Sequence, residues 1–491
     1  MPCNLKKICH AVSFLLQNSW LPMNHDNEIK TLLPISYLLP LIILIEGFTS
    51  IAIEILAIRQ LLPLVGSSII VTSLIIGGFL LFLALGYRKG GKRKDNLTKS
   101  LRTNFIVSAI WLGIGLSYCF ILLFFSEWGL RFGDNVFYPL IGYLLIIISP
   151  LIYILGQTVP VIMSLTKQNK SIGMIGGNTL GLSTAGSFLG ATITALVLMH
   201  FFGVAWTVFI NFLLLLFLYL LLVPSKKSFL IQLTIAMPVI ALIYYVNITF
   251  EKRMFVLTNN YANYQMIDHN NQILSEGEKI LSINQSASSF INKNNKGFPY
   301  IETIKKILFD DMKLQDAHIL VLGAGGFTLS AENTYGNHFT YVDIDKNIKQ
   351  VTVPQFISHI NGKLIDDDAR HFIHTNKDLF KAIIVDTFSN TRTIPGHLLT
   401  QEYFAELKQR LAANGVIIFN IIAKPSLEDA YSKRVDNSIR HIFKNCMVMP
   451  LTYENVTANI IYVCTNSANQ NDKTIYSDNL NSVTIDSFFH R

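Results

Sequence analysis

The chain has 491 residues, of which 51% are hydrophobic and 15% are charged, and its formal net charge is +8. Soluble domains carry about 25% charged residues, so the composition excludes an ordinary soluble protein along the whole length. The deficit lies in residues 32–246, and charges are ordinary after Glu251. The positive charge does not indicate nucleic-acid binding, because many basic residues of the first half lie in short loops between apolar segments, as in membrane proteins.

Near the N-terminus, the apolar stretch 11–16 is too short for a cleavable signal peptide and lacks a small-residue cleavage site, so we expect it at the membrane surface. Cysteines are few and scattered, and they stand at Cys3, Cys9, Cys119, Cys446 and Cys464. None forms a Cys-x-x-Cys pair and no histidine cluster accompanies them. We therefore expect neither a disulfide framework nor a zinc site. Cys119 lies within an apolar run and is expected in a core.

Seven apolar runs follow, each close to the roughly 20 residues that a helix needs to cross a bilayer core. Buried helices of a large soluble protein are the alternative, but seven long runs in succession, bounded by charged or turn residues, favour membrane spans. After an N-terminal segment (1–30), we predict a transmembrane domain of about seven helices over residues 31–250. The runs lie near Ile35–Ile58, Gly66–Gly86, Phe105–Phe125, Phe137–Leu165, Ile172–His200, Gly203–Val223 and Phe229–Ile248.

The loops between these runs differ in charge. The basic loop 88–94 should be cytoplasmic, and if the spans alternate, the lysines at 167, 170, 226 and 227 fall on the same side. An odd number of spans then places the second half outside, away from intracellular nucleoside cofactors, although the sequence Glu251-Lys252-Arg253 favours the inside. Three explanations stay open: one run is not a span, the N-terminal apolar stretch also crosses, or the second half is external.

Two patterns inside the runs go beyond lipid solubility. Glycines at 173, 177 and 181 recur every four residues and are followed by Gly186 and Gly190, a spacing that lets helix backbones approach closely; we predict tight packing. Glu46 and Glu54 lie in the first run, just before Arg59. Charges in a membrane indicate a functional site or a buried ion pair, and we favour a Glu54–Arg59 pair over a substrate path.

From Met254 the pattern changes. Short strands at Tyr264–Ile267 and Ile280–Ile283 predict a small β-rich subdomain over residues 251–310, with a helix near Ile301. Strand and helix signals then alternate, with a helix at Gln401–Leu411, which predicts a parallel, doubly wound, Rossmann-like sheet over residues 311–491. The predicted strands are His318–Leu322, Phe339–Val342, Lys363–Ile365, Lys381–Val385, Val416–Asn420 and Ile460–Cys464.

In such sheets ligands bind at the carboxyl ends of the strands. The first four strands end in glycines or carboxylates: Gly323-Ala324-Gly325-Gly326, then Asp343-Ile344-Asp345, then Asp366-Asp367-Asp368-Ala369-Arg370, then Asp386. Each feature alone is weak, because strand-end aspartates often only cap the next helix. The ordered set of four predicts a nucleoside site.

Each residue of the set has a physical role. Gly323 and Gly325 let the backbone approach a ligand without a Cβ in the way. Asp343 follows Gly323 by 20 residues, the spacing of an acid that binds ribose hydroxyls. Asp368 is placed for an adenine amino group beside the small Ala369, and Asp386 ends a buried strand. The loop lacks the full dinucleotide spacing Gly-x-Gly-x-x-Gly, which favours a mononucleoside such as S-adenosylmethionine over NAD.

These segments resemble the spermidine synthase (polyamine aminopropyltransferase) family, in particular its membrane-fused members. The resemblance covers nearly the whole chain beyond residue 35, and its soluble motifs are the more specific ones. It rests on residues 318–329, 339–345, 366–372 and 381–422, including Val385-Asp386-Thr387-Phe388-Ser389 and Ile394-Pro395-Gly396-His397. Further matches are Tyr264-Gln265, Pro299-Tyr300-Ile301-Glu302 and Asn178-Thr179-Leu180-Gly181.

The resemblance implies transfer of a propylamine group from decarboxylated S-adenosylmethionine to an amine such as putrescine, without a metal. Asp386 would be the catalytic acid/base. Donor contacts would come from Gln265, Gly323, Gly325, Asp343, Asp368, Ala369 and Pro395, and acceptor contacts from Tyr300, Glu302 and Ser389. We expect as partners a small-molecule amine, a nucleoside donor, the lipid bilayer and, as an option, a second copy in a homodimer, but no nucleic acid.

Three departures from the family pattern concern groups expected to hold ammonium ends. Gly326 or Phe327 stands for the usual Asp of the glycine loop, Ser389 for a second Asp after Asp386, and Ile301 for a His. Glu302, Asp366 or Asp367 are the candidates to compensate. Two alternatives therefore stay open: an S-adenosylmethionine-dependent methyltransferase, and a membrane carrier or sensor of polyamines without catalysis.

Overall fold

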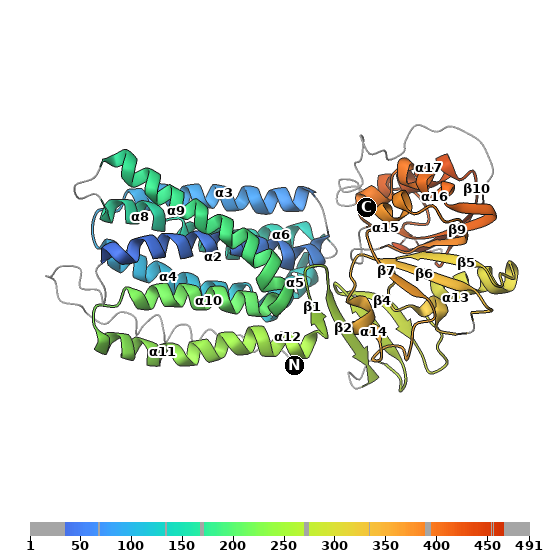
Figure 1. The fold of residues 1–491 in the computed structure, drawn as a ribbon, viewed down its shortest axis with the longest axis horizontal. Helices are drawn as coiled ribbons and strands as arrows, with labels where there is room; N and C mark the ends of the chain where they lie inside the picture. The colour runs from blue at the N-terminus through green and yellow to red at the C-terminus, as the bar shows by residue number, and fades with distance from the viewer. Residues whose placement is uncertain are drawn as a thin grey trace. The chain divides into compact units, whose positions relative to one another are not determined.

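The computed structural model describes residues 35–66, 69–132, 135–166, 171–269, 274–332, 334–387, 394–452, 454 and 456–465. The chain divides into two compact units (Figure 1). A helical unit ends at Met254 and an α/β unit takes over from Phe255, apart from short exchanges at residues 66–70 and 258–260. The helical unit and the α/β unit thus meet a few residues after the predicted division near residue 250.

The helical unit is a bundle, and each of the seven predicted apolar runs is helical in it. π-Helical segments at Leu144–Ile148, Thr194–Phe202 and Tyr245–Thr249 continue α6, α9 and α11, respectively. The helices are α2 (Ile35–Val65), α3 (Ile69–Gly91), α4 (Leu97–Gly115), α5 (Tyr118–Phe132), α6 (Phe137–Tyr143), α7 (Ser149–Leu155), α8 (Thr158–Leu165), α9 (Ile172–Ile193), α10 (Gly203–Leu221), α11 (Lys226–Tyr244) and α12 (Phe250–Met254).

Counted over the described residues, five helices are long and apolar enough to cross a membrane, or six if the pair Leu97–Gly115 and Tyr118–Arg131, bent by 64°, forms one span. One of the five, Ile172–Leu221, is 50 residues long. It is interrupted at Gly203, whose φ of +83° is not helical. A break there divides the overlong helix into two segments, each about long enough to cross a bilayer core, and it falls between the predicted runs Ile172–His200 and Gly203–Val223.

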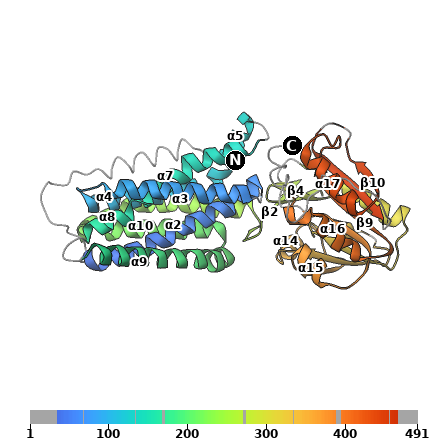
Figure 2. The same cartoon turned by 90° about the horizontal axis from the view of Figure 1, so that it is seen from above.

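Glycine packing in the bundle differs between the two groups of glycines on α9. A Cβ at Gly186 or Gly190 would collide with the backbone carbonyls of Leu44 and Phe48 on α2, so these glycines let the two helices touch. Figure 2 shows α9 lying beside α2. At positions 173, 177 and 181, a Cβ would meet nothing within 4 Å in the described residues. The prediction of tight packing is therefore correct for the second group and wrong for the first.

Polar groups of the bundle find partners inside it. Arg59 donates from Nε to the carbonyl of Asn259 at 2.6 Å. Glu251 accepts the Thr258 hydroxyl at 2.7 Å and the Ala205 N–H at 3.1 Å. Glu46, which is 2% exposed, accepts the Ser50 hydroxyl at 2.9 Å. The pairing of Glu54 with Arg59 stays a prediction, and Cys119 is buried as expected.

The α/β unit begins with a small sheet in the order β1-β2-β3-β4 and continues with a seven-stranded sheet. The small sheet consists of β1 (Leu257–Thr258), β2 (Asn263–Asp268), β3 (Lys279–Ile283) and β4 (Ser286–Ile291). The larger one consists of β5 (His318–Leu322), β6 (His338–Asp343), β7 (Lys363–Asp366), β8 (Phe380–Val385), β9 (Leu411–Ala423), β10 (Asn445–Pro450) and β11 (Ala458–Thr465).

The large sheet has the order β10-β11-β9-β8-β5-β6-β7. Strands β5 to β9 pair in parallel, whereas β11 pairs antiparallel with β9 and with β10. The prediction of a parallel sheet is thus wrong for this edge, and β10 was not predicted. The six predicted strands are all present. Strand order reverses between β5 and β8, so the switch point at which such sheets bind ligands lies there.

Helices cover both faces of the large sheet, because successive residues of its buried strands point to opposite sides. Leu320 and Leu322 pack with α15 (Ala369–Thr375), α16 (Gln401–Gln409) and α17 (Ala430–Ile442). Ile319 and Val321 pack with α13 (Pro299–Lys305), α14 (Ile348–Thr352) and the small sheet. Both faces are therefore closed to solvent, and the carboxyl edge of the strands is left for a site.

A disulfide corrects the expectation that the cysteines form none. Cys446 and Cys464 lie directly opposite each other on β10 and β11, with Cα atoms 4.1 Å apart. Their separation of 18 residues gave no motif, because antiparallel pairing alone brings them together. The bond ties the edge strand to the sheet.

Candidate active site

A cavity of about 580 Å³ lies at the carboxyl edge of the large sheet, within the size range of small-molecule sites. The strand ends form one wall, and residues of the small sheet and the start of α13 form the other. From the strand ends come Gly323, Gly325, Asp343, Asp367, Asp368, Ala369, Asp386, Thr387, Asn420, Ile422 and Asn459, and the opposite wall includes Ser286, Ala287, Ser288, Phe298 and Tyr300.

The glycine loop after β5 forms the floor of the cavity. Gly323 has a φ of +91°, and a Cβ there would collide with the backbone oxygen of Asp386. Gly325 also has a positive φ, +49°. The Gly326 N–H donates to the Ser289 hydroxyl at 2.7 Å, which ties the loop to β4. Both predicted glycines line the cavity. Position 323 also requires a glycine, because β5 and β8 end too close together to leave room for a side chain there.

Asp343 ends β6 and holds the same loop. Its Oδ2 accepts the Ala324 N–H at 2.9 Å, and its Oδ1 accepts the Asp345 N–H at 3.0 Å. Burial raises the pKa of Asp343, the two backbone hydrogen bonds oppose this, and the charges of Asp345 and Asp366 add to it. Each oxygen keeps a free lone pair in this pattern, so the carboxylate can hold the loop and still accept ligand hydroxyls. Its ribose contact stays a prediction.

Asp368 caps the N-terminus of α15, accepting the N–H groups of Arg370 at 2.9 Å and His371 at 3.0 Å through Oδ1. Oδ2 lies 3.5 Å from His397 Nε2. The ordinary helix-cap role is therefore real, yet the residue also lines the cavity together with Ala369 and Pro395. The three predicted adenine neighbours are thus brought together, and one atom of the Asp368 carboxylate is not used by the cap.

Asp386 follows β8, and its partners come from distant segments. Oδ2 accepts the Tyr300 hydroxyl at 3.0 Å and Oδ1 accepts Asn420 Nδ2 at 2.8 Å. Asn420 in turn accepts Asn459 Nδ2 at 2.8 Å. Burial raises the pKa of Asp386 to about 6, and the hydrogen bonds from Asn420 and Tyr300 lower it. Burial and the Asp386 charge raise the pKa of Tyr300, so near neutral pH a carboxylate faces a phenol.

Two predicted residues, Gln265 and Glu302, are not in the cavity lining. Gln265 lies on β2 opposite Ser282, and Ser389 falls outside the described residues. Glu302 accepts the Gly297 N–H at 2.7 Å and pairs with Lys305 at 3.0 Å. Their predicted ligand contacts stay predictions.

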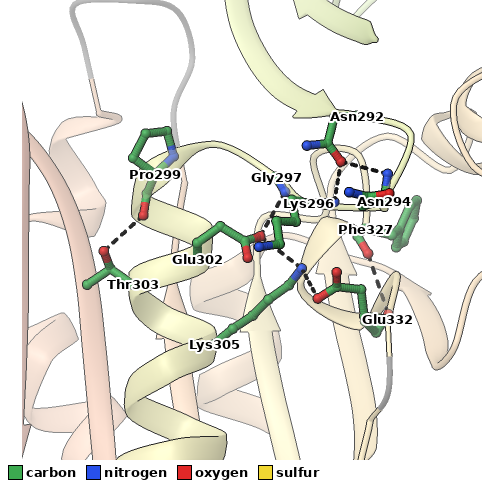
Figure 3. Close-up of polar contacts among 11 residues, drawn as sticks. Asn292, Asn294, Lys296, Gly297, Pro299, Glu302, Thr303, Lys305, Phe327 and Glu332 are labelled. Carbon is green, nitrogen blue, oxygen red and sulfur yellow. Dashed lines mark hydrogen bonds and ion pairs between the residues drawn. The ribbon is translucent and has the colours of Figure 1, made fainter. Parts of the chain in front are cut away.

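Figure 3 shows why Glu302 is engaged elsewhere. The buried Lys305 ammonium lies between Glu302 and Glu332, at 3.0 and 3.2 Å. The two carboxylates come from α13 and from the segment after the glycine loop, so the lysine fastens these elements to each other. Because α13 also carries Tyr300, the cluster fixes the helix that holds the hydroxyl donor to Asp386.

Sequence reasoning missed the roles of Asn420, Asn459 and Ser289. The first had a usable signal, since an amide in the apolar run Val416–Ala423 must find a partner when buried. The other two had none, because their partners depend on how β11 and β4 are placed. Among the described residues, no group of three or more His, Cys, Asp or Glu side chains could hold a metal ion.

Comparison with known proteins adds to this geometry. Residues 281–475 match the family described as "Spermine/spermidine synthase domain". The match begins at β3 and covers most of the α/β unit. A curated relative of this domain, the polyamine aminopropyltransferase of Vibrio vulnificus (strain CMCP6), is 32% identical over 142 residues, 27% of this chain. The chain spans about half (46%) of that relative's length.

Solved structures with weaker likeness to this chain include a probable spermidine synthase from Corynebacterium glutamicum ATCC 13032. It is 20% identical, covers 42% of this chain and 78% of that chain, and has a TM-score of 0.37. The spermidine synthase of Thermotoga maritima is 12% identical, covers 47% and 81%, and has a TM-score of 0.31. At these values the structural likeness carries no argument about activity.

Proposed function

We propose that the protein is an aminopropyltransferase. It transfers the propylamine group of decarboxylated S-adenosylmethionine to an amine and releases methylthioadenosine. The observation that carries this proposal is Asp386, a partly desolvated carboxylate at the switch point of the sheet, beside Gly323 and between Tyr300 and Asn420. The match of residues 281–475 to the synthase domain supports it.

In this proposal the nucleoside lies along the edge of β5, β6 and β7. Asp343 accepts the ribose hydroxyls, and the adenine lies between Asp368, Ala369 and Pro395, with its amino group donating to Oδ2 of Asp368, the oxygen that the helix cap does not use. The glycines at 323 and 325 leave room for the sulfonium and its propyl chain. Gln265 keeps its predicted donor contact, and Tyr300 and Ser389 keep their predicted acceptor contacts, as parts of the proposal, whereas the Glu302 carboxylate is bound to Gly297 and Lys305.

The chemistry then needs one carboxylate. Free alkylamines have a pKa of about 10.4, so the acceptor arrives as an ammonium that Asp386 can bind. Asp386 first accepts one proton from this ammonium, which frees the nitrogen lone pair. As the lone pair forms the C–N bond, the C–S bond breaks and its electron pair stays on sulfur, and the product nitrogen is a secondary ammonium. The sulfonium is an activated leaving group, so alignment of nitrogen, carbon and sulfur supplies much of the rate.

Incubation of the purified full-length protein with both sulfonium donors and a panel of amines, followed by mass spectrometry, tests the proposal. Formation of methylthioadenosine together with an aminopropylated amine is the expected result. Formation of S-adenosylhomocysteine would instead establish the alternative, a methyltransferase. That alternative has one observation in its favour: the glycine loop has no carboxylate at Gly326, whose N–H is bound to Ser289.

Membrane embedding of the helical unit is part of the proposal. If the chain crosses at each predicted run and reverses at Gly203, the basic loop 88–94 and Lys226 lie on one side, which is the cytoplasmic side by the positive-inside rule. The last span, Lys226–Met254, then delivers the synthase domain to the opposite side. The Cys446–Cys464 disulfide agrees with that placement, because such bonds persist in oxidising compartments.

Two reporter proteins, each fused to the C-terminus, determine on which side of the membrane the α/β unit lies. We expect alkaline phosphatase, which needs export, to be active there, and green fluorescent protein to be dark. A fluorescent fusion with inactive phosphatase would place the synthase domain in the cytoplasm instead. If the domain is outside, its donor has to be available on that side.

The carrier or sensor alternative is supported by Glu46, a buried carboxylate within the bundle. Amine flux into vesicles that is lost in Glu46→Gln, without any turnover, would favour it over catalysis.

A further inference from the structure

The cavity has two unlike ends, and the strand order tells them apart. Asp343, Asp367 and Asp368 lie at the ends of β6 and β7, to one side of the glycine loop. Beyond Asp386 on β8, the sheet continues with β9 and β11 on the other side. We call the residues 323, 325, 342–344, 367–369, 395 and 397 the donor half, and Asp386, Thr387, Asn420, Ile422, Leu451, Asn459, Phe298 and Tyr300 the acceptor half.

The acceptor half contains one carboxylate among its described residues, that of Asp386. Its other polar side chains are neutral: the hydroxyls of Tyr300 and Thr387 and two amides. The amides are joined in a chain, since Asn459 donates to Asn420 and Asn420 donates to Asp386. Beside Asn459 the wall is apolar, since Ile422 is its partner on β9 and the Leu451 N–H bonds to its carbonyl. Phe298 stacks with Tyr300 and adds another apolar side chain to this half. An acceptor held by Asp386 therefore extends past neutral amides onto an apolar surface.

Within the part of the chain that the structure describes, the residues next to the acceptor half do not supply a second negative charge. The loop 388–393, outside the described residues, has the sequence Phe-Ser-Asn-Thr-Arg-Thr and contains no acidic residue. Glu454 is exposed and is not part of the cavity lining. Adjacent strands lie about 4.8 Å apart, so Asp343, two strands from Asp386, is about 10 Å away and on the far side of the glycine loop.

A diamine fits this arrangement poorly. With one ammonium on Asp386, its second ammonium would lie against Ile422 and Leu451 without a counter-charge, and a cation removed from water without a partner is strongly disfavoured. Turning the diamine the other way would place that ammonium among groups that the proposed function gives to the nucleoside. An amine with a single charged nitrogen and an apolar arm avoids both problems.

We propose that the acceptor is a monoamine with an apolar arm, not a diamine. This inference rests on the proposed aminopropyl transfer and names the acceptor class of the same site. Asp386 binds the one ammonium and takes its proton during transfer, while Ile422, Leu451 and Phe298 contact the arm. The amide of Asn459 remains to select a hydroxyl or carbonyl on that arm.

The test compares n-butylamine with 1,4-diaminobutane, which differ in a methyl against an aminomethyl end. The detergent-solubilised full chain is given decarboxylated S-adenosylmethionine and either amine, and methylthioadenosine is measured. We expect kcat/KM to be at least tenfold higher for n-butylamine. Equal rates, or a preference for the diamine, would overturn the inference while leaving aminopropyl transfer established.

A designed second charge sharpens the test. Ile422→Asp is expected to shift the preference at least tenfold toward 1,4-diaminobutane, and Leu451→Asp, at a more exposed position, gives the same test if the first variant does not fold. Ile344→Asp places the same charge in the donor half and is expected to leave the ratio of the two amines unchanged. A ratio that moves equally in all variants would contradict the assignment of the acceptor half.

Binding separates the two proposals. Calorimetric titration of each amine into the protein loaded with methylthioadenosine needs no turnover. If neither amine yields product but n-butylamine binds more tightly, aminopropyl transfer is refuted and the acceptor class stands. If 1,4-diaminobutane binds more tightly, or neither binds, the acceptor class is refuted.

Discussion

The donor and acceptor halves of the cavity hold their carboxylates in different ways. In the donor half, Asp368 accepts N–H groups two and three residues further along the chain, and Asp343 accepts one from two residues further along. In the acceptor half, Asp386 is held by Tyr300 and Asn420, which are 86 and 34 residues away. Backbone N–H donors persist when side chains are substituted, so the donor half keeps its hydrogen bonds as the sequence changes. The acceptor half depends on two side chains, so substitutions there can change the substrate.

The most damaging change to the acceptor half should be Asp386→Asn. It keeps the shape and removes the proton acceptor, so we expect kcat to fall by a factor of about 10²–10⁴, as for loss of a general base. Methylthioadenosine affinity, a property of the donor half, should change little. The exposed Asp378→Asn is the matched control. Retention of full transferase activity in Asp386→Asn would contradict the mechanism.

The same variant makes a stability prediction with a definite sign. The folded pKa of Asp386, about 6, lies above the usual value of 3.8. Its contribution to stability is therefore complete below pH 3.8 and is lost as the pH rises through about 6. Asp386→Asn should be the more stable protein at pH 8, by about 1 kcal/mol or about 2–4 °C in thermal melting. A lower melting temperature of Asp386→Asn at pH 8 would show that the hydrogen bonds of Asp386 stabilise the fold by more than the burial of its charge destabilises it.

In the donor half, Asp343→Asn keeps one acceptor oxygen but turns an NH₂ toward the N–H of Ala324 or Asp345. We expect methylthioadenosine affinity to fall by about 10- to 100-fold, because a charge-assisted hydrogen bond worth roughly 1.5–3 kcal/mol is lost. Calorimetry measures this directly. The butylamine to diaminobutane ratio should stay unchanged, and a shift in it would mean that the two halves are not separate.

Tyr300→Phe is a milder change to the acceptor half. The phenol lowers the pKa of Asp386, so its loss should move the acidic limb of the pH–rate profile from near 6 to a higher pH. At neutral pH we expect kcat to decrease by about tenfold or less, because the Asp386 carboxylate loses one of the two hydrogen bonds that position it. The profile of kcat/KM against pH checks this. A shift to lower pH would contradict the hydrogen-bond assignment.

The smallest effect on catalysis is expected from Lys305→Met, which removes the ion pairs that hold α13. Without the ammonium, Glu302 and Glu332 face each other with no cation between them. We expect the free energy of unfolding to fall by only about 1–2 kcal/mol, because both carboxylates are partly exposed. Thermal melting should show the loss, and Lys306→Met, at an exposed neighbouring position, should not. Equal melting temperatures for the two variants would mean that the cluster does not fasten α13.

The sequence by itself predicted the six main strands and the gathering of their terminal glycines and aspartates at one edge. Those features depend on local information: runs of apolar residues, and glycines or aspartates directly after buried strands, whose ends must meet at one edge of a sheet. Gly323, Asp343, Asp368 and Asp386 all line one cavity for that reason.

Only the tertiary structure decided the partners of Asp386, the Cys446–Cys464 bond, the antiparallel edge and the outward-facing glycines at 173, 177 and 181. Each depends on which distant segments pack together. Glu302 is the clearest case, since its place in the sequence predicted an acceptor ligand, yet its carboxylate is bound to Gly297 and Lys305. A short motif shows which groups are available, while packing decides where each one points.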